Sequence, residues 1–326
     1  MSLTGVLEAL AADPALARAA ELATEGGTPV LDLTASSGAR PVALAALARC
    51  RPLLVVTATE RAARDLAAAL RCYLDPAGVV EFPAWETLPH ERLSPRSDTV
   101  GRRLAVLRRL AHPGAPGAED GPVRVVVAPV RAVLQPLVAG LGDLEPVQLR
   151  AGDEADLADV VERLAGAAYT RTDMVERRGE FAVRGGILDV FPPTVDHPLR
   201  VEFFGDTVEE VRAFAVADQR SLEVVEAGLW APPCREVLLT DDVRERAAAL
   251  RERLPGAAEM LDKLAAGIAV EGMESLAPVL VDGMEPLLDL LPEGSHVVVV
   301  DPEKVRARAH DLLATSEEFL AAAWAN

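Results

Sequence analysis

Lysine is almost absent from this sequence. Lys263 and Lys304 are its only two lysines, so arginine supplies nearly all of the positive charge. Arginine pairs well with carboxylates, but it does not serve as the lysine that a phosphate-binding loop places on its nucleotide. Aromatic residues make up only 4% of the chain. Such scarcity argues against a channel in which the bases of single-stranded nucleic acid stack on side chains.

The sequence also has few cysteines, no long apolar run and no excess of positive charge. Cys50, Cys72 and Cys234 are far apart and form no CxxC pair, which indicates buried thiols of a reduced cytoplasmic protein and no metal site. No apolar run is long enough for a membrane span or a signal peptide, so we expect a cytoplasmic protein with no membrane partner. The net charge of −18 disfavours nonspecific binding to nucleic acid, so any partner must be recognised through a local patch.

The densest pattern in the chain lies between residues 169 and 221, where short apolar runs alternate with glycine turns. Two predicted hairpins follow one another, with strands at residues 180–183, 187–191, 199–204 and 208–214. Because successive strand residues point to opposite faces, Arg200 and Glu202 share one face while Val201 and Phe203 share the other. The pattern predicts a small sheet with one packed face and one charged face.

The rest of the chain alternates predicted strands and helices, which implies a parallel sheet covered by helices. The predicted strands are 29–33, 53–57, 79–82, 123–128 and 235–239. The predicted helices include 2–23, 60–71, 98–110, 154–165, 242–254, 257–266 and 302–324. The four arginines of helix 98–110 are interpreted as a solvated face; they are Arg102, Arg103, Arg108 and Arg109.

A strand, loop and helix ending at residue 50 have the layout of a phosphate-binding loop without its residues. The loop consists of Thr34, Ala35, Ser36, Ser37, Gly38 and Ala39, and its last two residues stand where a lysine and a Ser or Thr are needed. Further on, Asp301 ends an apolar run, as a magnesium-binding aspartate does, but Pro302 replaces the glutamate that orients the attacking water. From the residues alone, a lost nucleotide site and a unit that never bound nucleotide are equally good interpretations. Both exclude hydrolysis by this chain.

Four motifs carry a resemblance to a known family. They are Y-x-R-x-D at 169–173, G-E-F-x-V-R-G-G-I-L-D-V-F-P at 179–192, L-R-V-E-F-F-G-D at 199–206 and Q-R-S at 219–221. Together they resemble the second domain of the excision-repair protein UvrB and of the transcription-repair coupling factor (Mfd). The segment W-E-T-L-P at 85–89 is similar to that of the coupling factors and decides between the two. The resemblance favours the lost nucleotide site over the alternative.

The resemblance implies an α/β fold, in which a degenerate RecA/helicase-like parallel-sheet lobe in two parts carries an inserted small mixed α+β domain. The implied domains are 1–135, with the degenerate phosphate loop, 136–215, which binds the repair protein UvrA, and 216–326, which completes the first lobe. The chain would then be a non-catalytic adaptor that recruits UvrA to stalled RNA polymerase. The residues that match the UvrA contact of UvrB are Arg171, Arg184, Arg200 and Glu202. Ala182 is a departure, because UvrB has an arginine there.

Two other functions stay open at this point. One is an ATP-dependent DNA-damage-processing protein of the UvrB type, against which the missing lysine argues. The other is an autoinhibitory module that docks the same charged face on the C-terminal part of its own protein. The resemblance also implies RNA polymerase and double-stranded DNA as partners of a full-length coupling factor. It places ATP and magnesium only in motor domains that this sequence lacks, so no cofactor or metal is expected here.

Overall fold

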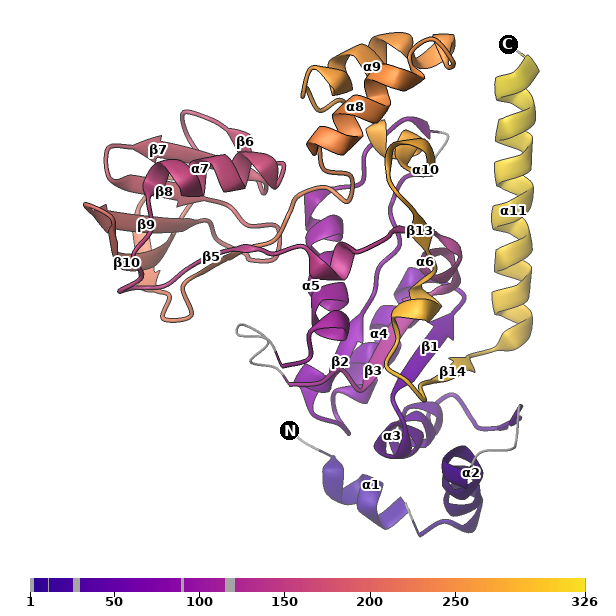
Figure 1. Ribbon diagram of the computed structural model, residues 1–326. Coiled ribbons are helices and arrows are strands. Elements are labelled where there is room, and N and C mark those ends of the chain that lie inside the picture. Colours follow the sequence, from indigo (N-terminus) through magenta and orange to yellow (C-terminus); the bar gives the residue numbers. More distant parts are fainter. Residues whose placement is uncertain (1–2, 11, 26–29, 89–90, 115–120, 326) are drawn as a thin grey trace. The chain divides into compact units, whose positions relative to one another are not determined.

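The computed structural model describes residues 3–10, 12–25, 30–88, 91–114 and 121–325 (Figure 1). The chain forms two compact units. The first unit comprises residues 1–84, 106–136 and 286–326, and the second unit comprises 85–105 and 137–285. Each unit contains its own sheet, so the predicted α/β class is confirmed. The predicted division at residues 135 and 215 stays a prediction.

The first unit is built on a four-stranded parallel sheet with the order β14-β1-β3-β2. These strands are β1 (Leu53–Thr57), β2 (Val79–Glu81), β3 (Val125–Pro129) and β14 (His296–Val299). Its helices are α1 (Thr4–Leu10), α2 (Pro14–Glu25), α3 (Arg40–Cys50), α4 (Glu60–Leu70), α6 (Val130–Leu134) and α11 (Pro302–Ala325). Every residue of β1 and β3 is buried, as expected for parallel strands covered by helices. Side chains from α1 to α4 form one core with β1, β2 and β3.

Several predicted elements of the first unit are confirmed, but its N-terminus differs in two ways. The predicted helix 2–23 is wrong, because α1 and α2 are separate helices. Pro14 starts α2 and lacks an N–H, and the Asp13 carboxylate accepts hydrogen bonds from Ala15 N at 2.9 Å and Leu16 N at 3.1 Å. A proline at the first helical position and an aspartate before it mark a new helix rather than the interior of a long one.

The predicted strand 29–33 is also wrong in its described part. Residues 30–33 form no strand, and the side chains of Val30 and Leu33 are 74% and 46% exposed; residue 29 lies outside the described residues. Strands β3 and β14 pair with the two edges of β1, so residues 30–33 cannot pair with this central strand. Residues 235–239 form no strand either. Apolar composition over four or five residues does not specify strand pairing by itself.

The second unit contains a six-stranded sheet with the order β11-β10-β9-β8-β7-β6. The strands are β6 (Thr170–Arg171), β7 (Glu180–Arg184), β8 (Ile187–Val190), β9 (Leu199–Phe204), β10 (Thr207–Phe214) and β11 (Ser221–Val224). Only β6 and β7 pair in parallel. Both predicted hairpins are therefore confirmed. Gly185 and Gly205, with φ of +62° each, supply the left-handed backbone of their two turns.

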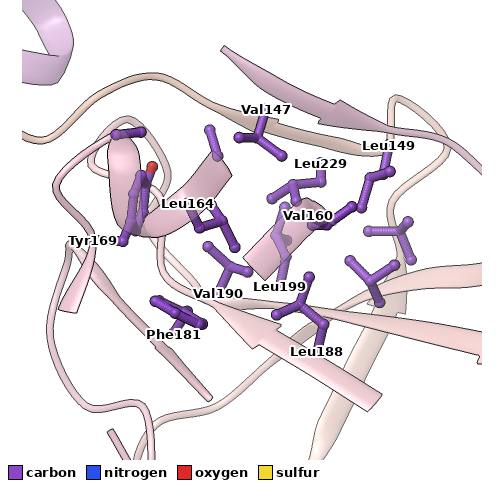
Figure 2. Close-up of a cluster of buried hydrophobic side chains, with 14 of the residues drawn as sticks. Val147, Leu149, Val160, Leu164, Tyr169, Phe181, Leu188, Val190, Leu199 and Leu229 are labelled. Carbon is purple, nitrogen blue, oxygen red and sulfur yellow. The ribbon is translucent and has the colours of Figure 1, made fainter. Parts of the chain in front are cut away.

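One face of this sheet packs against helix α7 (Leu157–Gly166). Val160 and Leu164 of the helix lie among Phe181, Leu188 and Leu199 of the sheet, and all five side chains are buried (Figure 2). A short antiparallel ladder of β5 (Val147–Leu149) and β12 (Leu229–Ala231) completes this core. A second core of the same unit lies among α8 (Asp241–Leu250), α9 (Ala258–Ala265) and α10 (Ala277–Leu280). The opposite face of the sheet carries charged residues together with a small buried apolar cluster that includes Ala182 and Phe214.

Two further elements complete the structure. β4 (Leu137–Val138) pairs with β13 (Met284–Glu285) in the second unit. Helix α5 (Ser97–Ala111) has residues in both units.

Candidate functional site

The sheet of the second unit has a charged face opposite the face that packs on α7. In β9, Leu199 and Val201 are buried in the core, so Arg200 and Glu202 point to the other side. Strand register places two rows of side chains there. One row is Ala182, Asp189, Arg200 and Arg212, and the other is Arg184, Ile187, Glu202 and Glu210. These eight residues are called the charged face below.

Arg200 is held inside this face by Asp189. Its Nε lies 2.7 Å from Asp189 Oδ1 and its Nη2 2.8 Å from Asp189 Oδ2. The two side chains are only 17% and 5% exposed, and the guanidinium carbon lies 4.8 Å from the centre of the Phe214 ring. The hydrogen bonds to Asp189 raise the pKa of Arg200 above its ordinary value. Both oxygens of the carboxylate and one edge of the guanidinium are thus used within the chain.

Arg184 and Glu202 are more available than Arg200. The Arg184 side chain is exposed and donates one hydrogen bond, from Nη2 to the Asp173 carbonyl oxygen. Glu202 is half-buried and makes no side-chain hydrogen bond within the part of the chain that the structure describes. Ile187 lies between them, because it is the Cα partner of both across adjacent strands. The structure therefore brings Arg184, Arg200 and Glu202 onto one face.

Arg171 does not share that face. Its parallel partner in the neighbouring strand is Phe181, which is buried in the core beneath α7. Paired residues of adjacent strands point to the same side of a sheet, so Arg171 belongs to the other side, at the outer edge strand. Its side chain is exposed there.

Ala182 is buried where UvrB has an arginine. The alanine is 2% exposed and packs in a small apolar cluster with Val175, Phe191 and Phe214. This cluster lies on the same side of the sheet as Arg200. A small apolar residue fits this cluster, whereas an arginine would have to reach past it to meet a partner.

The loop of Thr34, Ala35, Ser36, Ser37, Gly38 and Ala39 leads into α3, as predicted, and its residues are exposed or half-buried. The N–H groups of Ala39 and Arg40 donate to the Ser36 carbonyl oxygen at 3.0 Å and 3.2 Å. Pro41 follows and has no N–H to donate. A phosphate-binding loop uses such N–H groups to cradle its anion. Here the N–H groups of Ala39 and Arg40 are used by the Ser36 carbonyl oxygen, and Pro41 has no N–H group to offer.

The structure brings Asp301 to this loop through Arg40. Arg40 Nη1 lies 2.9 Å from Asp301 Oδ2, and Arg40 Nη2 lies 2.5 Å from Asp301 Oδ1. Hydrogen bonds from Arg40 lower the pKa of Asp301, and Lys304 at 3.5 Å adds a smaller effect. Asp301 has a left-handed φ of +52°, and Pro302 begins α11 directly after it. The guanidinium of Arg40, the cation at the start of α3, is therefore already bound by the Asp301 carboxylate.

Sequence reasoning missed a buried ion pair inside the second unit. Arg103 Nε lies 2.5 Å from Glu236 Oε1, and both side chains are 0% exposed. Trp85 Nε1 donates to the same oxygen at 2.9 Å. The interpretation of Arg103 as a solvated residue is wrong. Its spacing from the buried Val100 and Leu107, three and four residues away, places it on the buried face of α5.

The remaining predictions about sites concern metals, thiols and membranes. No group of three or more His, Cys, Asp or Glu side chains that could hold a metal occurs among the described residues. Cys50, Cys72 and Cys234 are free thiols, as predicted, but only Cys234 is buried. The predicted burial is wrong for Cys50, which is half-buried, and for Cys72, which is exposed. Within the described residues, no helix combines the length and the apolar character needed to cross a bilayer.

Comparison with known proteins places the charged face in a recognised domain. Residues 147–232 match the family model of the UvrB interaction domain. This stretch runs from β5 to β12 and contains the whole six-stranded sheet.

Relatives with known names cover most of the chain. The transcription-repair-coupling factor of Mycobacterium tuberculosis (strain CDC 1551 / Oshkosh) is 55% identical over 92% of this chain and 25% of its own length. That of Myxococcus xanthus is 37% identical over 70% of this chain and 20% of its own length, and that of Bacillus subtilis (strain 168) is 30% identical over 71% and 19%. The chain thus spans about a quarter or less of the length of these relatives. It matches the N-terminal region of the transcription-repair-coupling factors, and it contains a UvrB interaction domain.

Proposed function

We propose that this chain is a non-catalytic adaptor that recruits the nucleotide excision repair protein UvrA to stalled RNA polymerase. One observation carries the proposal. The UvrB interaction domain contains the six-stranded sheet, whose charged face exposes Arg184 and leaves Glu202 half-buried with no side-chain hydrogen bond among the described residues. A sheet face with charges of both signs suits a specific protein partner, because complementary charges fix orientation and exclude wrong partners. Arg171 would add a contact at the edge of the same sheet.

The proposal assigns no nucleotide hydrolysis to the chain. The loop at 34–39 has no lysine, Arg40 is engaged by Asp301, and Pro302 stands in place of a catalytic glutamate. The parallel sheet with its helices supports a degenerate RecA/helicase-like lobe, to which we assign residues 1–135 and 216–326, although residues 85–105 and 216–285 fall in the second compact unit. In this view the lobe is a scaffold and binds neither ATP nor magnesium. We expect Mg·ATP to leave its melting temperature unchanged, because a ligand that does not bind cannot stabilise the folded state.

Further partners belong to the full-length protein as we envisage it. RNA polymerase and double-stranded DNA would bind segments outside this sequence, in the cytoplasm. The C-terminal part of the same protein could also cover the charged face until polymerase stalls, which would make UvrA binding conditional. Both ideas rest on the adaptor proposal.

Calorimetric titration of purified UvrA with this chain tests the proposal. The wild-type chain should bind, and Arg184→Ala should weaken binding by about 30-fold or more, since truncating a partnered interfacial charge costs roughly 2–5 kcal/mol. Arg61→Ala is the matched control, because Arg61 is a 91% exposed arginine of the first unit. Absence of binding by folded wild-type chain would refute the adaptor role for this module.

A further inference from the structure

Phe204 is the most exposed large hydrophobic side chain among the described residues, at 76%. It is the last residue of β9, and the turn Gly205-Asp206 follows it. Alternation along β9 puts its ring on the same side as Arg200 and Glu202, at the end of the charged face. Exposed aromatic side chains are unfavourable in water, and aromatic residues are enriched where partners bind.

The neighbouring hairpin leaves one flank of the ring without side chains. Beside the end of β9 lie Gly185 and Gly186, the turn between β7 and β8, and neither has a Cβ atom. The Phe203 N–H donates to the Gly186 carbonyl oxygen at 2.8 Å. A Cβ atom on Gly186 would approach the Phe203 carbonyl oxygen to 2.8 Å, so the close contact of the two turns requires glycine. The sequence thus leaves the flank of Phe204 that faces this turn without a side chain.

The turn that carries Phe204 is held firmly by residues 152–155. Gly152 N donates to the Val208 carbonyl oxygen at 2.8 Å, and Val208 N donates to the Asp153 carbonyl oxygen at 2.9 Å. Ala155 N donates to the Asp206 carbonyl oxygen at 2.7 Å. Thr207, the cross-strand partner of Phe204, donates its hydroxyl to Glu154 Oε1 at 2.8 Å. A fixed platform lowers the entropy that binding must overcome.

Three residues of the charged face form the row next to this ring. Glu202 precedes Phe204 by two residues on β9, Ile187 is the cross-strand partner of Glu202, and Arg184 is that of Ile187. Strand spacing of about 4.8 Å and a rise of about 3.4 Å per residue place the four side chains within about 15 Å. Ile187 is 37% exposed and lies between Arg184 and Glu202, so the patch combines two apolar side chains, Ile187 and Phe204, with one cation and one anion. The four residues are called the tip patch below.

We infer that the tip patch is the centre of the UvrA contact and that Phe204 is its apolar anchor. The inference rests on the proposed function and deepens it. The surface on UvrA would hold an apolar pocket for Phe204, with an acidic group facing Arg184 and a basic group facing Glu202. Interface energy concentrates in a few such buried anchors, while charges around them set orientation. Arg200, bound to Asp189, is a positioning residue that fixes β9 and the turn beyond it.

Titration of purified UvrA with Phe204→Ala and Phe204→Leu tests the inference. Loss of the ring should weaken binding at least about 30-fold, or about 2 kcal/mol, while leucine should retain part of the affinity. Ile268→Ala is the matched control, because Ile268 is a 55% exposed apolar residue of the same unit outside the charged face. Thermal unfolding of both Phe204 variants should match the wild type, since the ring is mostly exposed.

The outcomes separate the inference from the function on which it rests. Wild-type binding with unchanged affinity in Phe204→Ala would overturn the anchor and leave the adaptor role intact. An equal loss in Ile268→Ala would also overturn it, because the effect would not belong to the tip patch. Absence of wild-type binding would overturn the adaptor role together with the anchor.

Discussion

Arg103 and Arg184 show how differently two arginines of one unit are used. Arg103 is fully buried against Glu236 and Trp85, whereas Arg184 is exposed on the charged face. Alternation along the strand was enough to predict the side of the sheet on which Arg200 and Glu202 lie. The ion pair of Arg103 could not be predicted in this way, because its partner is 133 residues away. Only the burial of Arg103 could be predicted, from its helical spacing to Val100 and Leu107.

At the residue scale, we predict that Arg103→Met strongly destabilises the second unit. The substitution leaves the Glu236 carboxylate buried without its cation, which typically costs about 3–5 kcal/mol. Urea unfolding followed by tryptophan fluorescence measures the change. Arg102→Met is the control, since this neighbouring arginine is exposed and its loss should change the free energy of unfolding by less than about 0.5 kcal/mol. Equal unfolding curves for the two variants would show that the buried pair does not stabilise the unit.

At the scale of elements, the start of α3 illustrates how a phosphate loop can be lost. The sequence lacks the lysine of a working phosphate-binding loop, which predicted that this loop binds no nucleotide. The structure adds that Arg40 is bound to Asp301. The apolar run at 30–33 was mistaken for a strand because composition carries no information on which strand it would meet. The two hairpins were predicted well, since glycine turns and alternation fix both their ends and their faces.

The ion pair of Arg40 and Asp301 predicts a dependence on pH. Arg40 lowers the pKa of Asp301, so the pair stabilises the fold above the ordinary pKa of an aspartate and loses this effect as pH falls through the lowered value. In Arg40→Ala, the pKa of Asp301 should rise toward its ordinary value. NMR titration of the Asp301 carboxyl carbon measures it, and Arg61→Ala serves as the control. An unchanged pKa would mean that Arg40 is not the cause of the shift.

The pair of Arg200 and Asp189 predicts that two arginines of the charged face behave differently. Arg200→Ala should lower the free energy of unfolding by roughly 2–3 kcal/mol, because the buried carboxylate of Asp189 loses its partner. Arg184→Ala should leave stability unchanged, since its side chain is exposed. Combining Arg200→Ala with Asp189→Asn should cost less than the sum of the single changes. Additive costs would contradict the structural role of Arg200.

At the scale of the whole molecule, the chain combines two units whose residues interleave in sequence. Residues 85–105 fall in the second unit, although more than thirty residues separate them from its main part. Within that unit, Ser94 Oγ donates to Glu274 Oε2 at 2.6 Å and Gly272 N donates to Ser94 Oγ at 2.9 Å. Such long-range contacts have no local pattern in sequence. The family resemblance, by contrast, was carried by local motifs and was confirmed by the comparisons.

The most direct test of the adaptor proposal is competition between this chain and UvrB for UvrA. If the UvrB interaction domain of this chain uses the surface that UvrB uses, labelled chain bound to UvrA should be released by purified UvrB. Fluorescence anisotropy follows the release, and the Arg184→Ala chain should be displaced at a lower UvrB concentration. Complete displacement is the result that the proposal predicts. Simultaneous binding of both proteins, with no loss of anisotropy at saturating UvrB, would contradict it.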